Sequence, residues 1–134
     1  NYNNIRLYKK DARELLLMLP KESLDEIFIL YPDPWPKSRH EKRRIINKEN
    51  LDLLLSILKI NGILHLATDA ENYFHSIRVL FENCLETQII NSDNYNIRPD
   101  NIISTRYEKK ASENERIPSY MEVKKILAKN KKVS

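Results

Sequence analysis

Glycine and cysteine are almost absent from this sequence. Its 134 residues include one glycine, Gly62, and one cysteine, Cys84. Glycine lets a backbone approach a phosphate or a cofactor closely, so a single glycine excludes a complete G-x-G-x-x-G fingerprint or P-loop within this chain. A single cysteine excludes an intrachain disulfide and is typical of a reducing compartment. We therefore expect a cytoplasmic protein. If it uses a nucleotide-like cofactor, we expect the loop that holds the cofactor to lie elsewhere.

Long hydrophobic runs and metal-ligand patterns are lacking too. No apolar stretch approaches the roughly 18–20 residues that a membrane span needs, so no membrane partner is expected. The three histidines show no spacing typical of metal ligands, so no metal is expected. The length suits one domain, and 41% hydrophobic residues can supply its core. We expect this domain over residues 1–125 and a basic tail over residues 126–134.

Positive charge is concentrated in one segment. The formal net charge is +4, and residues 37–48 (KSRHEKRRIINK) carry six of the 23 lysines and arginines and a single glutamate. This segment follows YPDPWP, a loop that its prolines stiffen. Closely spaced cations at a rigid turn suit the binding of phosphates with release of counterions. The segment therefore predicts a polyanionic partner, whereas the lysines near the C-terminus are more typical of a solvated tail.

Hydrophobic patterning predicts alternating strands and helices. The segment EIFILY at 26–31 is nearly continuous and apolar, which favours a strand buried on both faces of a parallel sheet. Asp11 and Asp69 have the positions of helix N-caps, and the pair Asn61 and Gly62 is typical of a helix exit. Residues 119–126 fit a strand or a helix. The other expected strands are 5–8, 63–68 and 88–91, and the expected helices begin at Asp11, near Leu51 and at Asp69.

This alternation predicts an α/β domain with a mostly parallel sheet. In such sheets ligands bind beyond the carboxyl ends of the strands. Three acidic residues, Asp11, Asp33 and Asp69, lie at the carboxyl ends of predicted strands. Their positions indicate a functional site at that edge, although helix capping alone can explain Asp11 and Asp69.

The segment YPDPWPKSRHEKRR at 31–44 closely resembles the P-D-P-W-x-K-x-R-H-x-K-R-R signature of the bacterial tRNA (guanine-N7-)-methyltransferases. Three further matches follow the order of that family: Asp11 with Ala12, the triplet ending in Asp69 with Tyr73 after it, and residues 105–108. The resemblance extends over the chain to about residue 125.

The resemblance implies a class I S-adenosylmethionine-dependent fold, a Rossmann-like sheet with strand order 3-2-1-4-5-7-6 and an antiparallel last strand. It also implies methylation of guanine N7 in the variable region of tRNA, with S-adenosylmethionine as cofactor. The first βαβ unit of the family has no counterpart in this sequence. We therefore expect an incomplete sheet, the C-terminal part of a longer enzyme, with weak or no cofactor binding on its own. The strand at 26–31 then becomes an apolar sheet edge that invites self-association or pairing with an N-terminal segment.

The family also implies roles for individual residues. Asp33 is the candidate catalytic residue, between cofactor and guanine, and Asp11 and Asp33 are the candidate cofactor contacts. Because guanine N7 carries a lone pair and loses no proton on methylation, a carboxylate is needed for positioning and charge stabilisation rather than as a strong base. Trp35 or Tyr107 could stack on a base exposed from the RNA. The candidate substrate-binding residues are Lys37, Asp69, Thr105, Arg106, Tyr107 and Glu108, and the candidate contacts to the tRNA backbone are Arg39, Lys42, Arg43 and Arg44.

Two other functions fit parts of the pattern. A non-catalytic tRNA-binding remnant of such an enzyme would keep the basic loop. An amino-group DNA methyltransferase has an acidic or amide residue followed by two prolines and an aromatic, whereas Asp33 and Trp35 enclose one proline only.

Overall fold

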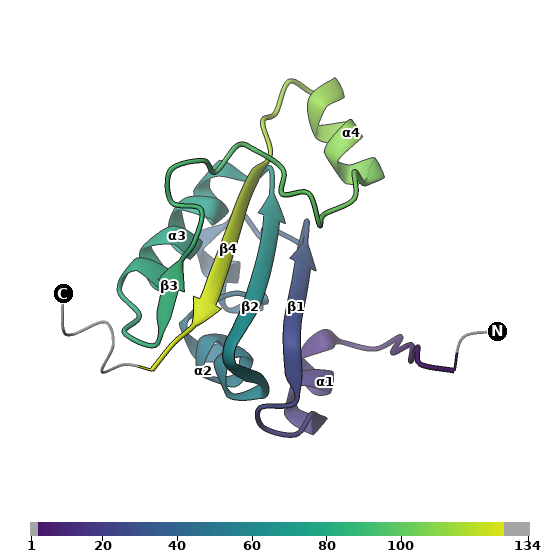
Figure 1. Ribbon diagram of the computed structural model, residues 1–134. Helices are drawn as coiled ribbons and strands as arrows, with labels where there is room; N and C mark the ends of the chain where they lie inside the picture. Colours follow the sequence, from purple (N-terminus) through teal and green to yellow (C-terminus); the bar gives the residue numbers. More distant parts are fainter. Residues whose placement is uncertain (1–2, 128–134) are drawn as a thin grey trace.

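The alternating pattern forms a four-stranded sheet with helices on one face in the computed structural model, which describes residues 3–127 (Figure 1). The elements in chain order are α1 (Ala12–Met18), β1 (Leu24–Leu30), the 3-10 helix η1 (Ser38–Arg43), α2 (Lys48–Ile57), β2 (Leu58–Thr68), α3 (Glu71–Glu82), β3 (Thr87–Ile89), α4 (Arg106–Glu113) and β4 (Ser119–Lys125).

The strands lie in the order β1-β2-β4-β3. β1 pairs with β2 in parallel, and β4 runs antiparallel to both β2 and β3. This is the order 4-5-7-6 of the class I sheet, with its last strand reversed. The predicted fold class is therefore confirmed, and residues 119–126, which fitted either a strand or a helix, contain strand β4.

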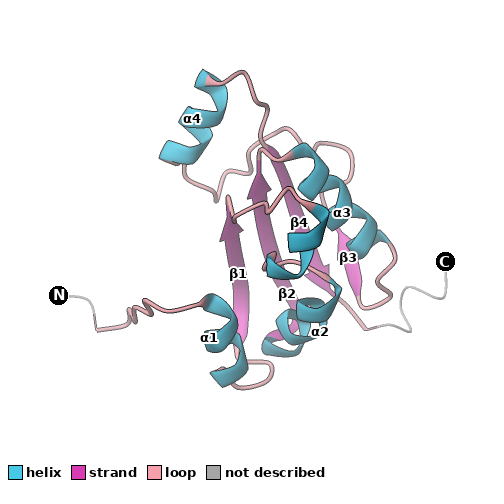
Figure 2. Cartoon of the chain, turned by 180° about the vertical axis from the view of Figure 1, so that it is seen from behind, coloured by secondary structure: helices cyan, strands magenta, loops and turns pink. Residues whose placement is uncertain are grey.

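The main core lies between the sheet and the helices α1, α2 and α3, which Figure 2 shows in front of the sheet. Alternate residues of β2 and β4, such as Leu66 and Met121, point to these helices and meet Ile77 and Phe81 of α3. All four side chains are at most 1% exposed. The other face of the sheet carries no helix within residues 3–127.

That second face carries a cluster of polar side chains around His65. His65 of β2 is 1% exposed. Its Nε2 lies 3.0 Å from a carboxylate oxygen of Glu26, its Nδ1 lies 3.2 Å from one of Glu122, and the ring of Phe28 stacks on it at 4.2 Å. Side chains from the two neighbouring strands thus bury His65 without a covering helix.

Two strand predictions need correction. Residues 5–8 form no strand, and Ile5 and Leu7 are 57% and 85% exposed. Within the described part of the chain no strand lies beside them, so their backbone groups have no ladder partner. β1 is not buried on both faces, because Phe28 and Leu30 remain partly exposed. It lies at the edge of the sheet, as the incomplete family sheet predicted.

The pair Asn61 and Gly62 does not end a helix. Helix α2 stops at Ile57, and the pair lies inside β2, where the pairing register with β1 shifts between Leu24 and Glu26. Asn61 has a φ of 69°. A Cβ on Gly62 would lie 2.8 Å from the carbonyl oxygen of Lys59, so the irregularity in the strand requires glycine.

Asp69 is also not the N-cap of α3. Ala70 occupies the cap position, and its N–H donates to Thr68 Oγ1 at 3.1 Å. At the C-terminal end of the chain, Lys125 Nζ donates to the carbonyl oxygens of Leu55 and Leu58 at 2.7 and 2.8 Å, and so satisfies the end of α2. The predicted tail lies outside the described residues from position 128 onward.

Candidate functional site

The loop after β1 holds Asp33 at the carboxyl edge of the sheet. Tyr31 and Trp35, on either side of it, have positive φ values of 52° and 42°, which bend the chain sharply within PDPWP. Asp33 is exposed, and its carboxylate makes no hydrogen bond or ion pair with any residue from 3 to 127. The site therefore presents a free negative charge on a stiff loop.

Arg44 fixes this loop from inside. The side chain is 7% exposed. Its Nε donates to the carbonyl oxygen of Pro34 at 2.7 Å, Nη2 donates to that of Trp35 at 3.4 Å, and Nη1 donates to Ser76 Oγ at 3.4 Å. The guanidinium also lies 4.8 Å from the ring centre of Tyr73. The predicted contact of Arg44 with an RNA backbone does not fit this burial, because the guanidinium is fully engaged inside the protein.

The remaining cations of the signature are exposed on and beside η1. Arg43 lies over the ring of Trp35, with its Cζ 5.0 Å from the ring centre. His40 meets the same ring edge-on at 5.8 Å. Trp35 is therefore partly covered by protein side chains. The exposed cations that remain free to meet a polyanion are Lys37, Arg39, Lys42 and Arg43.

Helix α4 brings Tyr107 to the same edge. Figure 1 shows α4 set apart from the sheet, beyond the carboxyl ends of β1 and β2. The ring of Tyr107 stacks on Tyr31 with centres 6.0 Å apart, and 49% of the residue stays exposed. The hydrogen bond from Arg106 lowers the pKa of the Tyr107 phenol, and the negative charge of Asp33 acts in the opposite direction. Tyr31, on which Tyr107 stacks, stands two residues before Asp33, so the stack adjoins the loop that carries Asp33.

Glu108 supports α4 and is not free. One carboxylate oxygen accepts from Tyr120 Oη at 2.8 Å, the other accepts from Ser104 Oγ at 3.3 Å, and Arg98 lies at 3.5 Å. Burial is the largest cause that raises the pKa of Tyr120 above the ordinary tyrosine range, and the neighbouring Tyr31 and Glu108 raise it further. Thr105 is the N-cap of α4 and accepts from Glu108 N–H at 3.2 Å. Both residues therefore hold the helix that carries Tyr107.

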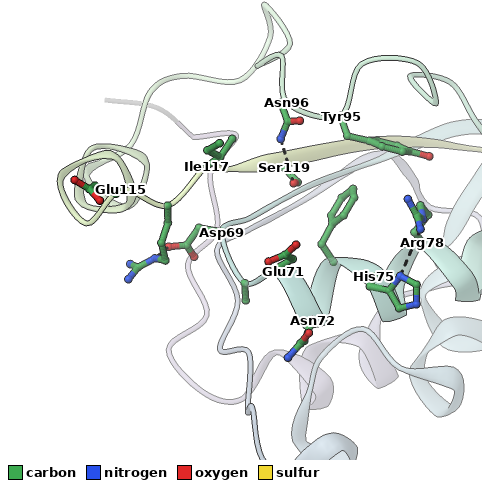
Figure 3. A pocket seen from close by; sticks show the side chains of 13 residues that line it. Asp69, Glu71, Asn72, His75, Arg78, Tyr95, Asn96, Glu115, Ile117 and Ser119 are labelled. Carbon is green, nitrogen blue, oxygen red and sulfur yellow. Dashed lines mark hydrogen bonds and ion pairs between the residues drawn. The ribbon is translucent and has the colours of Figure 1, made fainter.

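Asp69 lies in a hollow of about 940 Å³ beside the start of α3 (Figure 3). Its carboxylate pairs with Arg116, which follows α4. Glu71, Asn72 and Asn96 line the same hollow and offer donors and acceptors that suit nucleobase edges. A smaller hollow of about 220 Å³ shares residues 70–72 with it and reaches Pro34, Pro36 and Arg44, so the space extends to the loop of Asp33.

Asp11 stands apart from this group. It is the N-cap of α1, accepts from Arg13 N–H at 2.9 Å and pairs with the Arg13 guanidinium at 2.9 Å. The hydrogen bonds from Arg13 lower the pKa of the Asp11 carboxyl. Helix α1 lies beside the lower half of β1 in Figure 1, away from α4. Capping thus accounts for Asp11, and the structure does not bring it to Asp33.

Neither a metal-ligand cluster nor a membrane-spanning helix occurs in the described part of the chain. No group of three or more histidine, cysteine or acidic side chains within residues 3–127 is placed to hold a metal ion. None of the helices in this part of the chain has the length and apolarity to cross a membrane.

The sheet order, with a carboxylate-bearing loop at the carboxyl ends of its parallel strands, defines a methyltransferase-type α/β domain. Residues 1–119 match the family described as "Putative methyltransferase", and the chain belongs to that family. The family resemblance predicted from the sequence is thereby confirmed.

Curated relatives share most of this chain. The bifunctional methyltransferase of Rickettsia felis is 42% identical over 121 residues, which are 90% of this chain and 23% of that protein. The tRNA (guanine-N(7)-)-methyltransferase of Buchnera aphidicola subsp. Baizongia pistaciae is 43% identical over 82% of this chain and 46% of its own length. The enzyme of that name from Bartonella quintana is 40% identical over 89% of this chain and 52% of its own length. The chain thus spans about half the length of these tRNA methyltransferases.

A solved S-adenosylmethionine-dependent O-methyltransferase from Thermotoga maritima is 12% identical and gives a TM-score of 0.44 over 84% of this chain and 37% of its own.

Sequence reasoning missed two parts of the site. Helix α4 was not predicted, although the spacing from Thr105 to Glu108 is that of a capping box and could have indicated it. Arg116, the partner of Asp69, follows a polar stretch with no periodic pattern, and no sequence signal indicates it.

Proposed function

We propose that this protein takes part in the S-adenosylmethionine-dependent methylation of guanine N7 in the variable region of a tRNA. The observation that carries the proposal is the free carboxylate of Asp33, on a loop that begins at the Tyr31–Tyr107 stack and leads into a row of exposed cations. The names of the relatives from Buchnera and Bartonella support this substrate.

The chemistry requires positioning more than proton transfer. When bound, S-adenosylmethionine supplies an electrophilic methyl group. The lone pair of guanine N7 would take this methyl group as the sulfonium C–S bond breaks and S-adenosylhomocysteine leaves, and the purine would become cationic without losing a proton. Asp33 accepts hydrogen bonds from the N1–H and N2–H groups of guanine, and its negative charge stabilises the developing cation.

The RNA is held by charge and by stacking. Lys37, Arg39, Lys42 and Arg43 neutralise phosphates near the target nucleotide. Tyr107, which is 49% exposed, supplies the ring on which the guanine stacks, together with the Arg106 guanidinium that lies over it. Trp35 is less exposed and is covered by Arg43 and His40. Arg106 belongs to the same surface. Asp69 contributes to base recognition from the larger hollow, and Thr105 and Glu108 act through the helix they support.

The described residues supply only part of a cofactor site. Asp33 has a free acceptor for S-adenosylmethionine, whereas Asp11 is committed to Arg13 and to the start of α1. Neither hollow beside α3 is lined by these two aspartates. We therefore assign one cofactor contact, Asp33, to this part of the chain, and expect weak or no binding of the cofactor by residues 1–134 alone.

The edge strand β1 is proposed as a pairing surface. Its outer backbone groups have no strand beside them within residues 3–127, and Phe28 and Leu30 add apolar surface. Such an edge pairs with another strand, either from a second copy or from a segment preceding it in a longer protein. Sedimentation of the 134-residue chain tests this, because a monomer at all concentrations would contradict self-association.

The proposed activity is tested by methyl transfer to unmodified tRNA with the protein as its gene encodes it. The product is located by aniline cleavage after borohydride reduction, which breaks the chain at N7-methylguanosine. Transcripts with 7-deazaguanosine in place of guanosine are the control, because they lack the nucleophilic nitrogen. Cleavage at a guanosine of the variable region supports the proposal. Binding of tRNA without transfer would indicate an RNA-binding function instead.

A further inference from the structure

The signature arginines divide into two kinds that the sequence does not distinguish. Arg43 and Arg44 are adjacent, yet Arg43 is exposed over Trp35 while Arg44 is 7% exposed beneath the same loop. A buried guanidinium is costly unless its N–H groups are paired. Arg44 meets this requirement by donating to the carbonyl oxygens of Pro34 and Trp35. Pro34 is the residue directly after Asp33.

The same guanidinium joins the loop to α3. Its Nη1 donates to Ser76 Oγ, and its face lies over the ring of Tyr73. Tyr73 is itself fixed, because its hydroxyl oxygen accepts from Ile46 N–H at 3.0 Å and the residue is 1% exposed. The loop that carries Asp33 is therefore attached to a rigid helix through one side chain.

We propose that Arg44 is a positioning residue for Asp33. Its guanidinium holds the carbonyl oxygens of Pro34 and Trp35, the two residues that follow Asp33, and so sets the direction of the Asp33 carboxylate. The inference rests on the proposed function for its catalytic consequence, but its structural part stands on the contacts of Arg44 alone. A displacement of about 1 Å in a catalytic group can cost a hundredfold in rate, so loss of the Arg44 contacts should lower the rate of methyl transfer.

Trp35 provides a direct readout, because it is the one tryptophan of the chain. Acrylamide quenching of its fluorescence is measured in the 134-residue chain for Arg44→Met, Arg44→Lys and Arg39→Met. Arg44→Met should raise the quenching constant toward that of the unfolded chain, while far-UV circular dichroism stays that of a folded protein. Arg44→Lys should give an intermediate value, because lysine can donate to one carbonyl only. Arg39→Met removes an exposed arginine of η1, the helix that ends one residue before Arg44. The Nε of Arg39 donates to His40 Nε2 at 3.4 Å on the surface and the side chain has no contact with the loop carbonyls, so the quenching constant of this variant should change less than that of Arg44→Met.

A second measurement follows methyl transfer by the protein as its gene encodes it. Arg44→Met should lower kcat by about ten- to a hundredfold with a smaller change in KM for tRNA, whereas Arg39→Met should raise KM. Unchanged Trp35 quenching in Arg44→Met, together with a rise in KM alone, would overturn the positioning role and leave Arg44 an RNA contact. Increased quenching, with no guanosine methylation by any variant or the wild type, would overturn the proposed function and retain the positioning role. If Arg44→Met fails to fold, Ser76→Ala and Arg44→Lys carry the test.

Discussion

The ring of Tyr107 stacks on the ring of Tyr31 with their centres 6.0 Å apart. Tyr31 ends the run of residues that forms β1, and Tyr107 lies in the first turn of α4, so the stack connects the loop of Asp33 with a helix that is far away in the sequence. One face of Tyr107 meets Tyr31, and the residue remains half exposed. The Arg106 guanidinium also lies over this ring, with its Cζ 5.1 Å from the ring centre, so a base that stacks on Tyr107 meets both the ring and the guanidinium.

Replacing Tyr107 tests the platform. Tyr107→Ala should weaken the binding of tRNA about tenfold, because it removes a stacking surface for an unpaired base. Tyr107→Phe should retain most of the affinity, because the ring remains. Fluorescence anisotropy with labelled tRNA gives both values. Tyr8→Ala serves as the control, since Tyr8 is a partly exposed tyrosine that contacts Glu14 and lies outside the site.

The two aspartates predicted to contact the cofactor should respond differently to substitution. Asp33→Asn should lower kcat by about 10²–10³-fold, because the variant loses the charge opposite the cationic purine. Its thermal midpoint should stay within about 1 °C of wild type, since an exposed side chain without partners contributes little to stability. Asp11→Ala should lower the thermal midpoint by about 3–6 °C, because the N-cap of α1 and the pair with Arg13 are lost.

Thermal denaturation of the 134-residue chain and methyl transfer by the protein as encoded provide the measurements. An Asp33→Asn variant that is as active as wild type would contradict the catalytic role. A loss of stability in Asp33→Asn equal to that in Asp11→Ala would show that Asp33 is a structural residue.

Most helices and strands could be predicted, because they have strong local signals. The apolar run before Tyr31 and the leucine stripe of α2 specify their own conformations, and the family resemblance supplies the order of the strands. The strand at 5–8 was predicted from its composition alone. A strand needs a neighbour for its hydrogen bonds, and composition does not tell whether the neighbour is present.

The site was predictable in its residues but not in their partners. The signature indicates Asp33 and its cations, yet it treats Arg43 and Arg44 alike. Their difference arises from the side on which each lies relative to the loop: Arg44 contacts Ser76 and Tyr73 of α3, whereas Arg43 lies over Trp35. Asp69 was predicted to be a helix cap or a ligand contact, and the structure pairs it with Arg116, a residue 47 positions away.

Gly62 offers a test of the irregular start of β2. A methyl group there would lie 2.7 Å from Leu58 Cδ1, 2.8 Å from the Lys59 carbonyl oxygen and 2.9 Å from that of Asp25. Two of these atoms belong to the backbone and cannot rotate away. Gly62→Ala should therefore destabilise the fold by about 1–3 kcal/mol, as overpacking does elsewhere.

Urea denaturation measures this loss, with Asn61→Gly as the matched control. Asn61 has a positive φ, which glycine adopts without strain, so the control should remain within about 1 kcal/mol of wild type. Equal stability of Gly62→Ala and wild type would mean that the register of β1 and β2 differs from the one described.

Alkaline pH should weaken the attachment of α4 through Tyr120. Burial and the nearby Glu108 carboxylate raise the pKa of Tyr120 in the folded protein above the value of about 10 in an unfolded chain. A group whose pKa is raised by folding stabilises the fold fully below its unfolded pKa, and this contribution is lost as the pH rises toward the folded value. The urea midpoint should therefore fall as the pH is increased above about 10.

Tyr120→Phe separates this effect from general alkaline unfolding. At pH 7 the variant should be less stable by about 0.5–1.5 kcal/mol, because the hydrogen bond from Tyr120 to Glu108 is lost. Its decline above pH 10 should be smaller than that of wild type, although Tyr31 and Tyr73, whose pKa values burial also raises, still contribute. The hydrogen bond from Arg106 lowers the pKa of Tyr107 below the ordinary tyrosine value. In a pH titration followed at 295 nm, Tyr107→Phe should therefore lose a phenol that ionises below that value in the wild type. Identical alkaline declines for Tyr120→Phe and wild type would show that Tyr120 ionises as freely in the folded chain as in the unfolded one.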